Sequence, residues 1–154
     1  MKKGIWLIAL LLFGCSLSAD QEAQLSASVK DYIDAHNEGK VVSFVAFTHP
    51  NVVDHYLQKG DSVFQSKFTL LRAEEGGGHL QDPTIQTIES KGNNIQVHYQ
   101  VLSVYDQLFE MRSEEKDIYA ISHDDGETWF FVEEKDYLNS KIFTKEDRLI
   151  ETSP

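Results

Sequence analysis

The sequence predicts an α+β domain in which helices come first and an antiparallel sheet follows. Between about residues 25 and 71, apolar residues recur every three or four positions, the period of helices that bury one face. From Thr84 onward the period changes to two, which is typical of half-buried strands. Near the C-terminal end, Asp125-Gly126 separates two β-rich runs, as in a tight β-hairpin. Helices grouped before strands indicate the α+β class.

The first two helices are expected over Leu25–Glu38 and Val41–Phe47. In the first, the apolar positions keep helical spacing, and Gly39 follows as a C-cap residue. These positions are Leu25, Val29, Tyr32, Ile33 and His36. The second is apolar over more than one face and is expected to be buried. It stops at Thr48-His49-Pro50, because proline disfavours helical geometry at the residue before it.

A third helix is expected to start with Asp61 as its N-cap and to run to about Leu71. The triple glycine Gly76–Gly78 ends it. This glycine run follows two glutamates and precedes no Lys-Ser/Thr, so it is interpreted as a loop rather than a phosphate cradle.

Four strands are expected to form a meander. The first begins at Thr84, and Lys91–Asn94 turns the chain into a second strand at Ile95–Val101. A third strand is expected from about Leu108 to Ile121, and a hairpin returns it as a fourth. Residues 135–143 are expected to form a last short helix or an irregular cover.

The hairpin carries the pattern Ser-x-Asp-x-Gly-x-Thr-Trp at Ser122, Asp124, Gly126 and Trp129, which looks like the Asp-box of sialidase propellers. A propeller needs several blades, and the pattern occurs once, so sialidase chemistry is not implied. A structural role is expected: Asp124 accepts turn N–H groups, Gly126 takes a positive φ and Trp129 covers the hairpin base.

Residues 1–19 are interpreted as a signal peptide, because two lysines precede a short apolar run. Two cleavage sites remain open. Leu12-Phe13-Gly14-Cys15 resembles a lipobox, which implies cleavage before Cys15 and lipidation of its thiol, and Ser16 then suggests sorting to an outer membrane. Ordinary cleavage would follow Ala19. Residues 20–154 form a single domain that is expected to face the periplasm, as a lipoprotein or in soluble form.

The composition narrows the partners. The formal charge is −11, and it becomes −13 when Lys2 and Lys3 leave with the signal peptide, because all 25 acidic residues follow them. Nucleic acid is therefore not an expected partner. Cys15 is the single cysteine, so the domain has no internal disulfide and depends on its core.

No metal or cofactor is expected. His49 and His55 lie six residues apart across a proline, and the chain has neither a His-x-x-x-His pattern nor a cysteine pair. Proton transfer next to a carbonyl would need a tyrosine donor beside a carboxylate or imidazole base. Tyr32, Asp54, His55 and Asp117 could supply this set if the fold brings them together. Otherwise they are ordinary core, loop and strand residues.

Three segments together resemble the nuclear transport factor 2-like superfamily, especially its small exported bacterial members. These segments are Val29–Lys40, Phe47-Thr48-His49-Pro50 and Ile118–Val132, and the resemblance covers about residues 25–143. It implies a cone of curved sheet wrapped against helices around an internal pocket. By position, Tyr32 resembles the oxyanion-hole tyrosine of the ketosteroid isomerases, Asp54-His55 falls at their base and Asp117 falls near their second acid.

The resemblance leads to two functional hypotheses. In the first, an exported, lipid-anchored domain binds a small apolar ligand or an envelope protein without catalysis, and a homodimer could form through the outer face of the sheet. In the second, the domain is a cofactor-independent isomerase, cyclase or dehydratase. The pocket is expected to be lined by Tyr32, Phe47, Phe68, Tyr99 and Tyr119.

Overall fold

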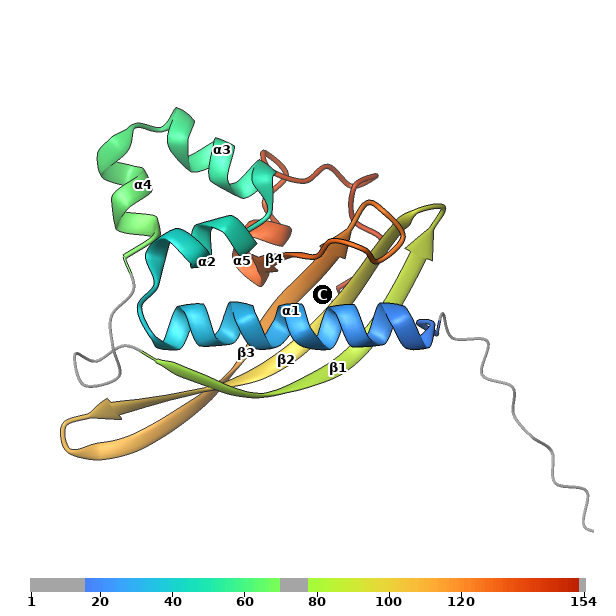
Figure 1. Cartoon of the computed structure of the whole chain (residues 1–154). Coiled ribbons are helices and arrows are strands. Elements are labelled where there is room, and N and C mark those ends of the chain that lie inside the picture. Colours follow the sequence, from blue (N-terminus) through green and yellow to red (C-terminus); the bar gives the residue numbers. More distant parts are fainter. Residues whose placement is uncertain (1–15, 70–77, 153–154) are drawn as a thin grey trace, which may run out of the picture.

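A computed structural model describes residues 16–69 and 78–152. Helices come first and an open, four-stranded antiparallel sheet follows, so the predicted α+β class is confirmed (Figure 1). The elements are α1 (Ala19–Asn37), α2 (Val41–Phe47), α3 (Pro50–Gln58), α4 (Asp61–Lys67), β1 (His79–Lys91), β2 (Asn94–Gln107), β3 (Glu110–Ser122), β4 (Phe130–Glu133) and α5 (Glu134–Tyr137). The strand order is β1-β2-β3-β4.

Helix α1 begins six residues earlier than expected, at Ala19 rather than Leu25. Its start is a capping box: the Ser18 hydroxyl accepts from the Gln21 backbone N–H at 3.2 Å, and the Ser18 N–H donates to the Gln21 side chain at 2.9 Å. The predicted apolar face is confirmed, because its members are buried: Leu25, Val29, Tyr32 and Ile33. No described helix, α1 included, is both long and apolar enough to cross a membrane.

The segment between the second and third predicted helices forms a helix of its own, α3. His49 is its N-cap and Pro50 its first residue, a position where the missing proline N–H leaves no bond unmade. The following helix, α4, has Gly60 as its N-cap, so the assignment of that role to Asp61 was wrong. Gly60 has a φ of 105°, which glycine alone adopts readily. The helix ends at Lys67, with Phe68 as its C-cap, so the expected extent to about Leu71 was wrong.

The first two strands are longer than expected. Strand β1 starts at His79 rather than Thr84, and β2 continues to Gln107. Leu108 was expected to open the third strand, but it and Phe109 form the two-residue turn between β2 and β3, with φ values of 54° and 69°. The pairing of β1 with β2 stops at Val104, so the tip of the β2–β3 hairpin extends beyond the end of β1 (Figure 1).

Side chains on the two faces of the sheet enter two separate cores. One face packs against α1 and α2, and it includes Val97, Tyr99 and Ala120. The alternate residues, such as Tyr119 and Ile121, pack on the other face. There they are covered by α5 and by the irregular segment that follows, through Tyr137, Ile142, Phe143 and Ile150. A short helix or an irregular cover was expected at residues 135–143. The chain forms both, because the helix α5 is followed by an irregular segment that covers this core.

Candidate functional site

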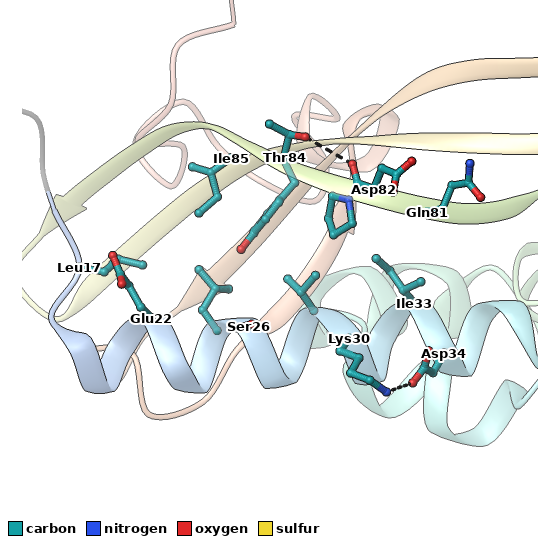
Figure 2. Close-up of a pocket in the computed structure, with 14 residues that line it drawn as sticks. Leu17, Glu22, Ser26, Lys30, Ile33, Asp34, Gln81, Asp82, Thr84 and Ile85 are labelled. Carbon is teal, nitrogen blue, oxygen red and sulfur yellow. Dashed lines mark hydrogen bonds and ion pairs between the residues drawn. The ribbon is translucent and has the colours of Figure 1, made fainter.

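A groove between α1 and β1 has a volume of about 700 Å³. Figure 2 shows α1 forming one wall and the first half of β1 forming the other. Its α1 wall contains two stripes at helical spacing. Leu25, Val29 and Ile33 form the apolar stripe, and Glu22, Ser26, Lys30 and Asp34 form the polar stripe beside it. The groove therefore joins an apolar surface to a polar rim.

The rim of the groove carries one internal ion pair. Lys30 and Asp34, one turn apart on α1, place Nζ and Oδ2 at 2.5 Å (Figure 2). The bond to the Asp34 side chain raises the pKa of Lys30. The other charged groups at the groove are Glu22 and Asp82, so its rim has more carboxylates than cations.

A bulge shapes the β1 wall. The register of β1 against β2 shifts between Gln81 and Thr84, and Asp82 has a φ of 52°. Pro83 lies at this point and has no N–H to offer. Because β1 is one of the two outer strands of the sheet, the bulge interrupts its free edge beside the groove.

Tyr99 reaches the groove from β2. Its side chain lies on the face of the sheet that packs against α1, and only 5% of the residue is exposed. Burial raises the pKa of Tyr99 to about 12, so the phenol stays protonated. Within the described chain the hydroxyl has no hydrogen-bond partner.

Tyr32, the expected oxyanion donor, is a core residue. It is 2% exposed, and its ring stacks between Phe44 and Phe131, at centroid distances of 5.0 and 4.6 Å. Burial raises the pKa of Tyr32 well above its ordinary value. The ring is thus fixed by aromatic packing on the α1 side of the sheet.

Asp117 points to the opposite face of the sheet. Its Oδ1 lies 2.7 Å from His98 Nε2, and the His98 ring stacks on Tyr119, which belongs to the core under α5. Asp117 and Tyr32 nevertheless both line a smaller cavity of about 290 Å³ beside β3. The carboxylate itself is directed away from the Tyr32 ring.

Asp54 and His55 lie on α3, where they border a separate shallow recess with Lys141 and Ile142. The four expected catalytic residues therefore do not meet in one cavity.

The expected pocket residues are divided in a similar way. Phe68 is buried in the core, Phe47 packs against that core, and Tyr119 is buried on the other face of the sheet. Of the five, Tyr99 alone lines the large groove.

His49 and His123 form a hydrogen bond, with their Nε2 atoms 2.9 Å apart. His49 Nδ1 accepts the Asn51 N–H at 3.1 Å, so it carries no proton, and the proton of the neutral ring lies on Nε2. A protonated Nε2 cannot ligate a metal, and the contact is an N–H···N bond. The described residues contain no group of three or more potential metal ligands.

The Ser122–Trp129 hairpin is held by its own side chains. The Ser122 hydroxyl accepts from the Gly126 N–H at 2.8 Å, and Asp124 Oδ1 accepts from the Thr128 N–H at 2.8 Å. Trp129 Nε1 donates to the Gly126 carbonyl at 3.0 Å. The Gln21 side chain of α1 donates to the Asp125 carbonyl at 2.8 Å, so the hairpin also anchors the start of α1. The polar groups of these side chains thus form hydrogen bonds that stabilise the hairpin, in agreement with the structural role expected for them.

Sequence reasoning missed the groove because the signal for it is short. Asp82-Pro83 interrupts the alternation of apolar and polar residues, and proline in a strand indicates an edge or a bulge.

No protein-family model matches the chain, and searches of curated proteins and of solved structures return no match either.

Proposed function

We propose that this protein is a non-catalytic binding domain that holds a small apolar ligand in the groove between α1 and β1. The groove itself carries the proposal: about 700 Å³ is within the range of small-molecule sites. Its apolar stripe on α1 continues across Pro83 and Ile85 of β1. Burial of apolar ligand surface against these side chains would supply the binding free energy, at about 25 cal/mol per Å².

The β1 bulge favours a small molecule over an extended protein segment. A groove between an edge strand and a helix suits a peptide that adds to the sheet through backbone hydrogen bonds. Here the edge is interrupted at Asp82-Pro83, where the proline offers no N–H. A ligand that needs no backbone ladder fits this wall better.

Isomerase-type catalysis lacks its geometry. The Tyr32 ring and the Asp117 carboxylate lie on opposite faces of the sheet, and Asp54-His55 borders a third site. A general base has to reach the proton that it abstracts, directly or through one water. The proposal therefore assigns no reaction to these four residues. The sheet and helices are compatible with a nuclear transport factor 2-like cone, which we retain as the proposed fold family.

We also propose that the domain is exported and lipid-anchored through Cys15. The capping box supports this site over cleavage after Ala19, because the latter would remove the Ser18 cap and the first residue of α1. An N-cap contributes about 1 kcal/mol to helix stability. Mass spectrometry of the mature protein distinguishes the two: a lipid-modified Cys15 is expected at the N-terminus, and an unmodified chain that begins at Asp20 would contradict the proposal.

The binding proposal is tested with N-phenyl-1-naphthylamine, a neutral apolar dye whose fluorescence rises in apolar sites. We expect saturable binding by the wild-type protein and at least about tenfold weaker binding by Ile85→Asp, which places a charge in the groove. Ile85 is 44% exposed, so the fold should tolerate this change. Val42→Asp is the matched control, because Val42 is 86% exposed and outside the groove. Absence of binding, or equal binding by both variants, would refute the proposal.

A further inference from the structure

The Tyr99 hydroxyl is a polar group of the groove that a purely apolar ligand would leave without a partner. The side chain is largely buried and bonds to no described residue, but the hydroxyl is not among the fully buried unpaired atoms, so water at the groove can reach it. A bound ligand displaces this water, and a hydroxyl that then lacks a hydrogen bond costs about 1–3 kcal/mol. A ligand that offers the hydroxyl an acceptor avoids this cost and is therefore favoured.

Two other polar groups of the groove bond elsewhere and not to the Tyr99 hydroxyl. Thr84 donates its hydroxyl to the Asp82 carbonyl at 3.4 Å, and Lys30 is paired with Asp34. The Tyr99 phenol, with its pKa near 12, remains a neutral donor at physiological pH. It can therefore supply a proton to an acceptor oxygen of a bound molecule.

The rim charges indicate that this acceptor is neutral. Glu22, Asp34 and Asp82 oppose the single ammonium of Lys30, which is already paired. The whole chain carries a formal charge of −11, so an anionic head group would be repelled both locally and at long range. A carboxylate or phosphate ligand is disfavoured on both grounds.

We propose that the ligand is an uncharged molecule with a ketone or ester carbonyl between alkyl groups, and that the Tyr99 hydroxyl donates a hydrogen bond to this carbonyl. This inference rests on the proposed binding function and names its ligand class. The alkyl groups lie along Leu25, Val29 and Ile33 of α1. Tyr99 is thereby a specificity-determining residue, since it distinguishes a carbonyl from a hydrocarbon of the same shape.

The test uses displacement of N-phenyl-1-naphthylamine by three probes of similar size. Nonan-5-one carries the carbonyl, dibutyl sulfide has the same shape with a weak acceptor, and nonanoate carries a negative charge. We expect nonan-5-one to bind at least about tenfold more tightly than nonanoate. The ratio of ketone to sulfide affinity should fall about fivefold in Tyr99→Phe, as for the loss of one hydrogen bond of about 1 kcal/mol.

Tyr105→Phe is the matched control, because Tyr105 lies in the hairpin beyond the groove and should leave the ratio unchanged. Infrared spectra give a second measurement: the carbonyl stretch of bound nonan-5-one should lie at lower frequency in the wild type than in Tyr99→Phe. If the dye binds but the ratio and the stretch are the same in both proteins, the inference is overturned and the binding proposal stands. If the dye and all three probes fail to bind, the binding proposal itself fails.

Discussion

Acidification should destabilise the fold through His49, the N-cap of α3. Burial, helped by the neighbouring His123, lowers the pKa of His49 from 6.5 to about 4, although Asp147 acts in the opposite direction. The hydrogen bonds also disfavour the protonated, positively charged form of His49, because Nδ1 accepts the Asn51 N–H. Protonation at Nδ1 would break this cap bond.

The magnitude follows from the two pKa values. Between pH 6.5 and 4 the unfolded chain binds a proton at His49 that the folded chain excludes, so stability rises with pH in this window. The stability that the neutral His49 ring contributes is fully present above pH 6.5 and is lost as the pH falls towards 4. A shift of this size corresponds to about 3 kcal/mol, since each pKa unit is worth about 1.4 kcal/mol.

Urea unfolding at pH 7.5 and 4.5, followed by circular dichroism, measures this loss. The comparison protein is His49→Asn, which keeps an acceptor for the α3 cap but does not titrate. Burial also lowers the pKa of His36, and this contribution is present in both proteins and cancels. The wild type should lose about 2–3 kcal/mol more than the variant. Equal losses in the two proteins would show that His49 is not the group responsible.

Three further substitutions test the packing, each by urea unfolding at pH 7. Lys67→Met should destabilise by about 2 kcal/mol, because it leaves the Asp136 carboxylate, 2% exposed and 2.6 Å from Lys67 Nζ, without its cation. An unchanged midpoint would show that this pair contributes nothing. Gly126→Ala should cost at least about 1 kcal/mol, because the φ of 88° strains any other residue. Equal stability would contradict that backbone geometry. The double change Leu108→Asn/Phe109→Gly should stabilise by about 1 kcal/mol, since both turn residues have positive φ. A loss of stability would indicate that the apolar tip packs in the free protein.

The parts of the fold that follow local rules could be predicted. The buried face of α1, the change to a period of two and the turn at Asp125-Gly126 each have a short-range signal, and Gly126 has the expected positive φ of 88°. The hairpin is not the tight one expected, because residues 123–129 separate the end of β3 from the start of β4. The β2–β3 turn could not be found in this way. Leu108 and Phe109 are 86% and 101% exposed in a conformation that bulky residues rarely adopt.

The candidate site depended on tertiary placement that spacing does not encode. Asp117 and Tyr119 are two residues apart and so share a face of β3, but the sequence does not state that Tyr32 lies across the sheet from both. Tyr99 alternates with polar neighbours, which predicts a half-buried strand, but only the structure shows that its face of the sheet packs against α1. Whether its hydroxyl has a hydrogen-bond partner depends on how α1, β1 and β2 are placed around the groove, which the sequence does not give.

Leu17 lines one end of the groove, and this position connects ligand exchange with attachment to a membrane. Cys15, where the sequence predicts a lipid, precedes Leu17 by two residues, and two residues of chain span at most about 7 Å. On a lipidated protein the groove would therefore open at the bilayer surface. An apolar carbonyl compound dissolved in the membrane could then enter the groove without crossing bulk water, and removal of the lipid should slow its transfer from vesicles more than it weakens equilibrium binding.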